Sequence, residues 1–395
     1  MKKVQPDVEA FARIRVVGVG GSGCNAVNHM VDSKVRGVDF VAVNTDAQDL
    51  HNTRTKKKIH IGKNLTRGLG TGMNPDMGKR AAEETKEEIQ EALKNSDMVF
   101  VTCGMGGGTG TGAAPVIAKT ARETGALTVA VVTKPFSFEG QQRMRLAELG
   151  LEDLRKEVDA LVVIPNDRLL AVVQRETTVK SAFAMCDDIL KQAVEGISDI
   201  ITTPGIVNVD FADIRAVMDN AGSALMGIGV ASGEKRAEDA AKAAINSPLL
   251  EVSIAGAKGV LFAIAGGDDL SMLEVQDAAK IITESIDPNA KVIFGAVFDA
   301  TLKKNEVKIT VIATGFPEHS MSGKSSSLFQ LSKKAMDKEE KKDKIYNSVS
   351  ILGGEETKKD DKKKSTKDKG EETKKDDDND DWSTIPAFLR RSKLK

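Results

Sequence analysis

Continuous hydrophobic runs alternate with amphipathic stretches over the first half of the chain. The runs are rich in β-branched residues and fall near residues 13–19, 38–43, 98–103, 127–133 and 159–164. Runs of this kind are typical of parallel strands that are buried on both faces. Because helical stretches separate them, the pattern predicts a doubly wound α/β domain with a parallel sheet, in which ligands bind beyond the carboxyl ends of the strands.

The second half of the chain begins with a long helical stretch. It predicts a helix over residues 179–201, which Pro204 and Gly205 end. Strand-like runs follow near residues 224–230, 259–264, 291–298 and 306–314, together with helical stretches near 235–246 and 273–286. Their order predicts a second domain of the α+β type with a mixed sheet.

The character of the sequence changes after residue 317. Lys, Asp and Glu dominate residues 333–381, and large apolar side chains are few. Such a segment cannot bury enough apolar surface to offset the entropy of ordering it, so we expect a disordered, flexible tether. Apolar residues return near the end, where Ile385, Phe388 and Leu389 would share one face of a short helix.

The composition narrows the class of protein. The 395 residues suffice for two domains, and the net charge of −1 gives no electrostatic case for nucleic acid. The three cysteines are odd in number and far apart, and they form no metal-ligand spacing with the four histidines. No apolar run approaches the roughly 20 residues of a membrane span, and the start lacks the apolar stretch of a signal peptide. We therefore expect a cytoplasmic protein without a membrane span.

The candidate chemistry lies in glycine-rich loops, of which residues 106–112 are the most informative. They have the sequence Gly-Gly-Gly-Thr-Gly-Thr-Gly and lie between the strand-like run at 98–103 and a helical stretch. Glycine allows the backbone to approach a ligand closely, and the free N–H groups at a helix start favour an anion. Because the two threonines add hydroxyl donors, this loop is typical of a polyphosphate site.

Two further glycine loops support this interpretation. Residues 15–27 again have the order strand, turn, helix, and residues 68–72 precede a helix opened by Asn74 and Pro75. Alone, the first loop would also fit an NAD-dependent oxidoreductase with Asp46 on the ribose, and each loop taken singly could be a structural turn. Three such loops favour a phosphate site, and the missing Walker sequence disfavours an ordinary P-loop enzyme.

Taken together, these motifs resemble the tubulin/FtsZ superfamily. Residues 106–112 match its signature, and the segments 18–27, 43–46, 65–70, 104–115, 165–167 and 208–213 are similar to the bacterial cell-division GTPases of the FtsZ family. The resemblance is nearly continuous over residues 12–317, and residues 381–391 resemble the family's C-terminal partner peptide. It implies an extension at 1–11, a GTP-binding domain at 12–178, a central helix at 179–203, an α+β domain at 204–317, a disordered charged linker at 318–380 and a partner-binding peptide at 381–395.

The resemblance implies that the glycine loops bind the phosphates of GTP or GDP, mainly through backbone N–H groups. The residues concerned are Gly20, Gly21, Ser22, Gly23, Cys24, Asn25, Gly70, Thr71, Gly107, Gly108, Thr109, Gly110 and Thr111. Ser22 and Cys24 depart from residues that are common in the family, but backbone donation survives either change. Cys24 would be either a thiol with a lowered pKa beside a phosphate or an inert small residue.

A second set of residues is implied to contact the sugar, the phosphates and the base. It consists of Thr133, Pro135, Glu139, Arg143, Asn166, Phe183 and Asp187. A carboxylate such as Asp187 can accept from N1–H and N2–H₂ of guanine, a pair of donors that adenine lacks, and Phe183 can stack on the ring. From the sequence alone, Glu139 and Arg143 could instead form a surface ion pair on one helix face, and Phe183 could be an ordinary core residue.

The phosphate loops contain no clear general base. From the residues alone, Asp210 could be the N-cap of a helix and Asp213 an acid in its first turn. The resemblance implies instead that Asn208, Asp210 and Asp213 enter the nucleotide pocket of the next subunit, where the acids position the attacking water. Mg²⁺ would offset the phosphate charge without direct ligation by the protein, and hydrolysis would follow from positioning and electrostatics.

A site completed by a neighbour predicts head-to-tail filaments, because such a contact repeats and need not close. The resemblance implies a polymerisation-activated GTPase that forms the cytokinetic ring of bacterial division, at mid-cell beneath the inner membrane. Membrane-anchoring and regulatory division proteins would bind the C-terminal peptide through Ile385, Pro386, Phe388, Leu389, Arg390 and Arg391. The alternatives are a catalytically idle scaffold and a plasmid-partitioning or shape-control relative.

Overall fold

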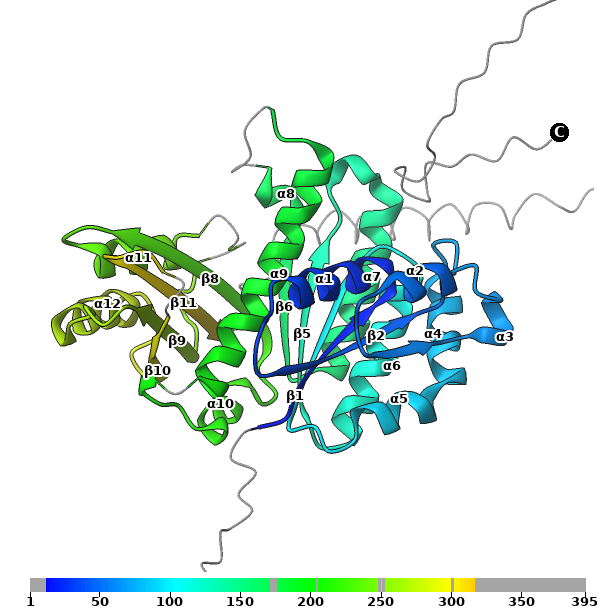
Figure 1. Ribbon diagram of the computed structural model, residues 1–395, viewed down its shortest axis with the longest axis horizontal. Coiled ribbons are helices and arrows are strands. Elements are labelled where there is room, and N and C mark those ends of the chain that lie inside the picture. The colour runs from blue at the N-terminus through cyan, green and yellow to red at the C-terminus, as the bar shows by residue number, and fades with distance from the viewer. Residues whose placement is uncertain are drawn as a thin grey trace, which may run out of the picture. The chain divides into compact units, whose positions relative to one another are not determined.

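The computed structural model describes residues 12–170, 176–203, 205–247, 250, 253–299 and 302–316. Three of the predicted segments, the N-terminal extension, the charged linker and the C-terminal peptide with its partner-binding side chains, lie outside the described residues. The helices and strands of the described part are shown in Figure 1.

The strands fall into two groups along the chain. The first group is parallel and comprises β1 (Ile14–Val19), β2 (Val38–Asn44), β3 (Lys57–His60), β4 (Met98–Gly104), β5 (Leu127–Lys134) and β6 (Ala160–Pro165). The second group is mixed and comprises β7 (Gly205–Val207), β8 (Gly222–Ser232), β9 (Gly259–Gly266), β10 (Lys291–Phe298) and β11 (Glu306–Thr314). The predicted fold class is thereby confirmed.

The two groups are joined into one sheet of 11 strands, in the order β3-β2-β1-β4-β5-β6-β8-β11-β9-β10-β7. The junction is a short parallel pairing of β6 with β8, in which Ala160 faces Gly222 and Val162 faces Ala224. No local pattern in the sequence predicts that the two sheets are continuous, because strand pairing depends on residues far apart in the chain.

Helices cover both faces of the parallel part. One face is packed by α1 (Gly20–Asp32) and α9 (Val179–Thr202), and the other by α4 (Pro75–Glu84), α5 (Lys86–Leu93), α6 (Thr109–Glu123) and α7 (Gln141–Glu157). On the same face as α9, α10 (Phe211–Met218) packs against β9 and β10 of the mixed part. Short helices lie in the connections, namely α2 (Ala47–Asn52), α3 (Lys63–Thr66), the 3₁₀ turn η1 (Ser137–Glu139) and α8 (Asn166–Leu169).

The long helix α9 packs against strands from both groups. Its buried residues recur at helical spacing, and Ile189, Val194 and Ile197 belong to the same hydrophobic cluster as Val16 of β1 and Ile312 of β11. Thr178 caps the helix by accepting a hydrogen bond from the Ser181 N–H over 3.2 Å. Burial of this apolar stripe therefore stabilises both parts of the sheet together.

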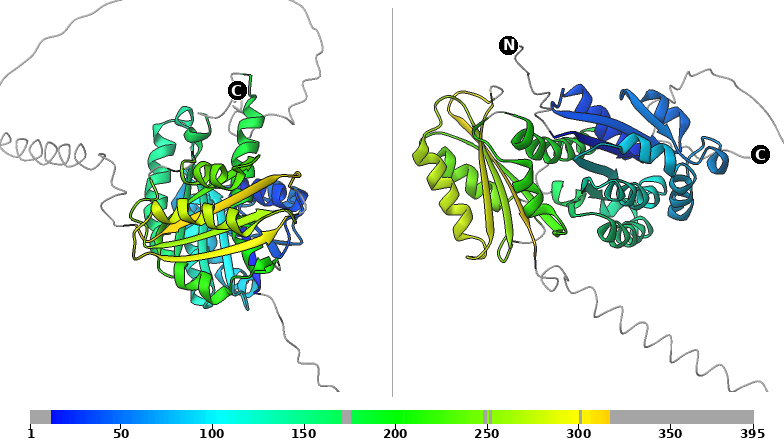
Figure 2. Two further views of the ribbon diagram at one scale, coloured as in Figure 1. Left: turned by 90° about the vertical axis from the view of Figure 1, so that its left-hand side faces the viewer. Right: turned by 90° about the horizontal axis from the view of Figure 1, so that it is seen from below.

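The mixed part of the sheet has its own helical cover on the other face. Helices α11 (Arg236–Ile245) and α12 (Met272–Glu284) pack there, and Figure 2 shows them side by side over the strands. Arg236 is 5% exposed, and its guanidinium joins the two helices, because it donates to the carboxylate of Glu274 over 2.6 Å and to Asp269 over 2.7 Å. This pairing lowers the pKa of Glu274 from 4.5 to about 2.

The Arg236 pairing predicts an acid-sensitive contribution to stability. Because the pKa of Glu274 is depressed in the folded state, the contribution is complete above pH 4.5 and is lost as the pH falls toward 2. At pH 7, Arg236→Met should lower the free energy of unfolding by about 2 kcal/mol, and the loss should shrink in acid. Urea unfolding at pH 7 and pH 3 measures this. As a control, Lys242→Met breaks only the exposed pair with Glu238 and should cost less than about 0.5 kcal/mol; equal losses in the two variants would contradict the prediction.

Candidate functional site

Two helices begin at the carboxyl edge of the parallel sheet, side by side. Helix α1 starts at Gly20, directly after β1, and α6 starts at Thr109, a few residues after β4. Because β1 and β4 are neighbours in the sheet, the two helix starts lie at the same place along its edge. The first N–H groups of each helix have no acceptor within the helix, so both sets of donors are directed at this edge.

The two glycine loops are in direct contact. Gly20 has a φ of +71°, and a Cβ added there would lie 3.0 Å from the backbone nitrogen of Gly110. A side chain at Gly20 would therefore be strained and crowded. Gly107 is different, because a Cβ at this position would meet nothing within 4 Å. The loop thus borders open space on this side, where a ligand can approach the backbone.

Threonine side chains join the third loop to the signature loop. The hydroxyl of Thr109 lies 2.6 Å from that of Thr45 and 3.2 Å from that of Thr71. Thr111 accepts a hydrogen bond from the Gly106 N–H over 2.9 Å and so closes the signature loop. Gly70 precedes Thr71 with a φ of +80°. The structure thus brings together the three loops that were predicted separately.

Helix α1 divides its predicted phosphate residues between two faces. Gly21, Ser22 and Asn25 are exposed at the start of the helix, whereas Gly23 and Cys24 are buried. Cys24 packs with Ala42 and Leu50, and burial with the nearby charge of Asp49 raises its pKa to about 12. Of the two alternatives for Cys24, burial therefore favours the small residue that packs in the interior over the thiol with a lowered pKa.

Glu139 and Arg143 form the ion pair that the sequence allowed, with 3.1 Å between Oε2 and Nη1. The two residues do not share a helix, because Glu139 ends η1 and Arg143 lies in α7. The other oxygen of Glu139 accepts from the Phe136 N–H over 2.9 Å. Nearby, at the carboxyl end of β5, Thr133 and Pro135 are buried, and the Thr133 carbonyl accepts from Met105. This group therefore lies beside the signature loop.

Two polar atoms among the predicted nucleotide residues are buried without a partner. They are Nε of Arg143 and Oδ1 of Asn166, the first residue of α8. Most buried polar groups in folded proteins have a hydrogen-bond partner, and each exception calls for a reason. A bound polar ligand would give one, because a donor and an acceptor are both available here.

Phe183 and Asp187 lie one turn apart on α9. Phe183 is 38% exposed and contacts Phe136 edge-on, with 5.4 Å between the ring centroids, so the alternative of a core residue is wrong. Burial raises the pKa of Asp187 to about 6, although His29 acts in the opposite sense. The carboxylate of the next residue, Asp188, contacts the imidazole of His29, with 2.8 Å between Oδ1 and Nε2. This contact links α9 to α1.

Asp46 is engaged as a helix cap rather than free for a ribose. Its carboxylate accepts from the backbone N–H groups of Gln48 over 2.9 Å and Asp49 over 3.1 Å, at the start of α2. The NAD alternative required this carboxylate as a ribose ligand, so the local geometry disfavours it.

The predicted catalytic residues lie elsewhere. Asp210 caps α10 by accepting from the Ala212 N–H over 3.3 Å, and Asp213 lies in the first turn, as the capping interpretation predicts. Asn208 accepts from the Gly205 N–H over 2.7 Å. All three residues are exposed.

Helix α10 lies near the amino ends of the parallel strands. Arg215 of α10 donates to the carbonyl of Gly125, which precedes β5, over 2.9 Å. Because the eight residues of β5 span about 25 Å, the acids lie far from the glycine loops of the same chain. Within one chain, the structure does not bring the predicted acids to the phosphate loops.

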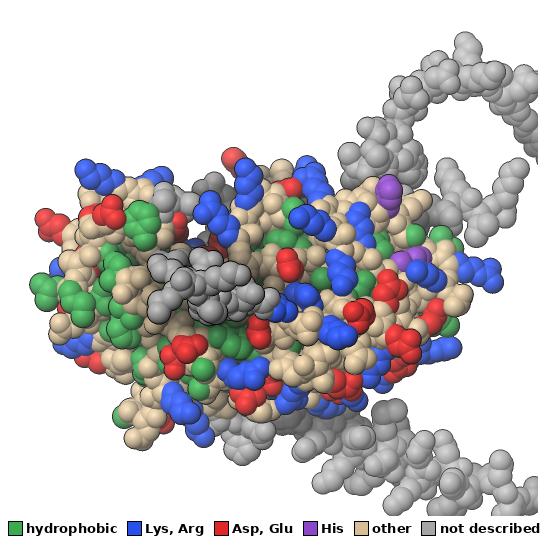
Figure 3. All heavy atoms as spheres, turned by 60° about the horizontal axis from the view of Figure 1, so that its bottom comes forward, with side chains coloured by type: hydrophobic (Ala, Val, Ile, Leu, Met, Phe, Trp, Pro, Cys, Tyr) green, Lys and Arg blue, Asp and Glu red, His purple; other side chains and the backbone are tan. Residues whose placement is uncertain are grey.

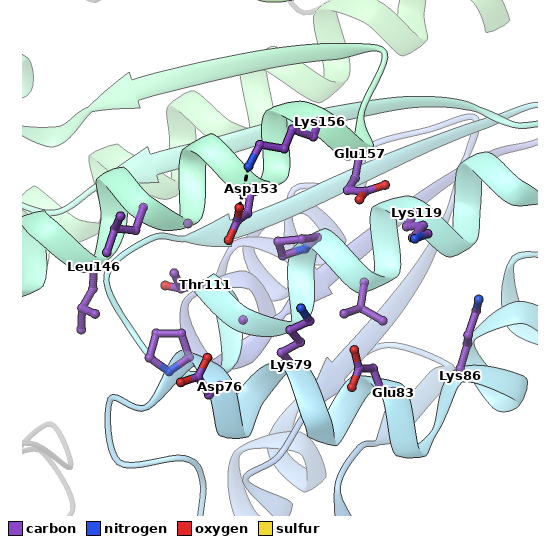
Figure 4. Close-up of a pocket in the computed structure, with 16 residues that line it drawn as sticks. Asp76, Lys79, Glu83, Lys86, Thr111, Lys119, Leu146, Asp153, Lys156 and Glu157 are labelled. Atoms are coloured by element: carbon purple, nitrogen blue, oxygen red, sulfur yellow. Dashed lines mark hydrogen bonds and ion pairs between the residues drawn. The ribbon is translucent and has the colours of Figure 1, made fainter.

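A groove of about 600 Å³ follows the outer side of α6, between α4 and α7. It reaches Thr111 and Gly112 at one end, and Figure 4 shows a rim on which Lys79, Lys119 and Lys156 alternate with acidic side chains. The lining includes Thr111 and Gly112 of the signature loop but not Gly107, so the groove does not include the open side of the loop.

Two family models match the chain. The model of the Tubulin/FtsZ family GTPase domain matches residues 13–174, and that of the FtsZ family C-terminal domain matches residues 222–317. Among solved structures, an empty FtsZ dimer from M. jannaschii is 49% identical, with a TM-score of 0.74 over 77% of this chain and 88% of that one. The chain belongs to the FtsZ family.

The FtsZ family membership makes this chain a GTPase, and its nucleotides are those of the family, GTP and GDP. The resemblance inferred from the sequence is thus confirmed, and the oxidoreductase alternative is wrong. CetZ2 from Haloferax volcanii, solved as a GTPγS-bound protofilament, has the same fold at 22% identity, with a TM-score of 0.68 over 83% of this chain and 99% of that one.

The partly buried carboxylate of Asp187 predicts a conflict between stability and ligand binding. Its pKa of about 6 in the folded state lies above the ordinary value of 3.8, so its ionisation costs stability above pH 6, and the cost fades as the pH falls toward 4. At pH 7.5, Asp187→Asn should stabilise the nucleotide-free FtsZ-family chain by on the order of 2 kcal/mol and weaken its binding of GDP.

Urea unfolding across this pH range and GDP titration measure the two effects. Asp188→Asn is the matched control, because Asp188 is 48% exposed and its neutralisation should not stabilise the chain. If Asp187→Asn left stability unchanged at pH 7.5, burial would not be the dominant property of this carboxylate.

Proposed function

We propose that this chain assembles head to tail into filaments and hydrolyses GTP at the contact between subunits. The observation that supports this most directly is the separation of Asp210 and Asp213 from the glycine loops, at opposite edges of one sheet. One subunit alone cannot bring its acids to its own glycine loops, whereas two subunits can form a complete site at their contact. A contact between unlike faces repeats along a line, so filaments follow.

The glycine loops are proposed to hold the phosphates. The open side of Gly107, together with the unpaired N–H groups at the starts of α1 and α6, suits a phosphate chain. Arg143 adds a positive charge and a buried donor without a partner. In this arrangement Gly20, Gly21, Ser22, Gly23, Asn25, Gly70, Thr71, Gly107, Gly108, Thr109, Gly110 and Thr111 surround the phosphates, with Cys24 contributing only its backbone.

The base is proposed to lie between α8 and α9. Asn166 has a buried carbonyl oxygen without a partner, which can accept from a base. Phe183 has an exposed ring that can stack, and the Asp187 carboxylate can accept from the paired N–H groups of guanine. Because adenine lacks that pair of donors, this set would favour GTP over ATP. Thr133, Pro135 and Glu139 would border the sugar and phosphates beside Arg143.

Mg²⁺ is proposed to accompany the nucleotide. The carboxylate of Asp49 lies 3.3 Å from the position that a Cβ on Gly21 would take, so an acidic group borders the loop. Mg²⁺ prefers hard oxygen donors, which the phosphates would supply without direct ligation by the protein. When bound, the ion would offset phosphate charge, while the chain's own residues hold and orient the nucleotide.

The acids are proposed to act on the nucleotide of the next subunit. Asp210 and Asp213 would position and polarise the attacking water, and Asn208 would hold the loop that presents them. Because Asp210 caps α10, its carboxylate is held in a fixed position at the start of the helix. A fixed position is what orienting a water molecule requires. Apolar side chains flank both edges, since Leu69 in the third loop is 85% exposed and Ile206 of β7 is 72% exposed. Figure 3 shows the molecule with the bottom of Figure 1 turned forward. On this face, acidic, basic and apolar side chains are interspersed.

The proposed role in the cell is the cytokinetic ring, which the sequence resemblance assigns to bacterial division. The similar structures are a dimer and a protofilament, which supports self-association of this fold. Among the described residues, no helix is long and apolar enough to cross a membrane. Attachment at the division site, at mid-cell in the cytoplasm, would then depend on anchoring and regulatory proteins that bind the C-terminal peptide.

Turnover should therefore depend on protein concentration. GTP hydrolysis per subunit and light scattering should rise above the same threshold concentration, because the site forms only in a filament. ATP should support neither signal. A constant hydrolysis rate per subunit, without scattering, would mean that one subunit holds a complete site, and the proposed role of Asp210 and Asp213 would fail.

Two inactive variants should restore activity when they are mixed. Asp213→Ala retains the glycine loops but lacks an acid, while Gly107→Asp places a carboxylate in the open space of the phosphate loop without a steric clash. Each variant alone should lose most of its turnover. Mixed, a Gly107→Asp subunit can present its acids to GTP on an Asp213→Ala subunit, so turnover should recover. No recovery, with both variants folded, would contradict catalysis between subunits.

A further inference from the structure

A polar contact holds the far end of α10 to the far end of α6. The guanidinium of Arg122, in the last turn of α6, donates from Nη2 to Oδ1 of Asn220, two residues after α10 ends. The same guanidinium pairs through Nε with the carboxylate of Asp159 over 3.2 Å. Three segments that are far apart in the sequence therefore meet at one side chain.

Asp159 is a fixed anchor for this contact. Its side chain is 5% exposed, and its second oxygen accepts from the backbone N–H of Thr128 at the start of β5 over 2.8 Å. Its own carbonyl accepts from the Gly222 N–H at the start of β8 over 2.9 Å. Because Asp159 is held by the sheet on two sides, it holds Arg122 in a fixed direction toward Asn220.

Asn220 is built to receive this contact. Its φ is +50°, a conformation that an L-residue other than Asn, Asp or Gly adopts at a cost, and it places the side chain against α6. A second contact runs in parallel, since Arg215 of α10 donates to the Gly125 carbonyl just beyond α6 and lies over the ring of Phe211. We name Arg122, Asp159 and Asn220 the clamp.

We propose that the clamp is a positioning device for hydrolysis, which sets where a subunit's catalytic loop stands when it meets the next subunit. The proposal rests on the proposed function of Asp210 and Asp213. Both acids are at the amino-terminal end of α10, and the clamp holds the carboxyl-terminal end, so a shift or tilt of α10 would displace them together. Arg122 lies at the opposite end of α6 from the signature loop of its own chain, and its proposed effect on hydrolysis is exerted through α10.

The first test is Asn220→Gly, which removes the acceptor for Arg122 and keeps the positive φ without strain. We expect turnover per subunit at saturating protein to fall about tenfold, because small misplacements of a catalytic group are costly. GDP affinity and the unfolding midpoint should not change. Asn305→Gly is the matched control, since Asn305 also has a positive φ, of 65°, but lies in the turn before β11, and it should retain full turnover.

A double-mutant cycle separates the clamp from a general loss of structure. Arg122→Lys keeps a positive charge beside Asp159 but cannot also reach Asn220 with a planar fork. If the two residues act through one contact, the double variant should be no slower than the slower single variant. Additive losses would show that Arg122 and Asn220 act separately and would overturn the proposal.

Mixed filaments show which subunit needs the clamp. Asn220→Gly is added either to the Gly107→Asp variant, which donates the acids, or to the Asp213→Ala variant, which holds the GTP. Turnover should fall only in the first mixture, because the clamp acts on the loop that a subunit presents. A loss only in the second mixture, in both or in neither would overturn the proposal. If the parental pair does not complement, the proposed function itself fails and the clamp has nothing to position.

Discussion

The close approach of α6 to α4 is the constraint on which the rest of the site depends. A Cβ at Gly112 would lie 1.9 Å from the carbonyl oxygen of Pro75, so only glycine allows the two helices to meet there. This contact sets the start of α6 against the sheet edge, where Thr109 meets the neighbouring loops. The last turn of the same helix carries Arg122 near the opposite edge of the sheet, so α6 contacts both halves of the proposed divided site.

In the proposed nucleotide site, side chains suited to a ligand reduce the stability of the empty chain. Arg143 and Asn166 each bury a polar atom without a partner, and burial raises the pKa of Asp187. Each of these groups is costly in water-free surroundings and becomes favourable once a complementary donor or acceptor arrives. Ligand binding should therefore stabilise this region more than the rest of the sheet, because the compensation is local.

Much of the fold could be predicted from the sequence, because long periodic segments leave a clear pattern. The helix expected at residues 179–201 is observed as Val179–Thr202, and the strands at 291–298 and 306–314 match their expected bounds. β3 was missed because its lysines interrupt the apolar pattern of an edge strand, and β7 because it has three residues. The orientation of Cys24 depends on which face of α1 is buried, and the contact between Arg122 and Asn220 joins residues 98 positions apart; neither leaves a local signal.

Electrostatic repulsion between the acids and the phosphates explains why the proposed site is divided between two subunits. On the proposed assembly, two carboxylates approach a triphosphate, and like charges at about 4 Å repel by several kcal/mol in the partly dry surroundings of an interface. Keeping the acids exposed at one edge and the phosphates at the other leaves both solvated in the free subunit, so neither is destabilised before assembly. The repulsion would arise only when two subunits meet, where Mg²⁺, when bound with the nucleotide, would offset it. Loss of the γ-phosphate would remove negative charge from this contact, so the strength of the contact would change with the chemistry that the contact performs.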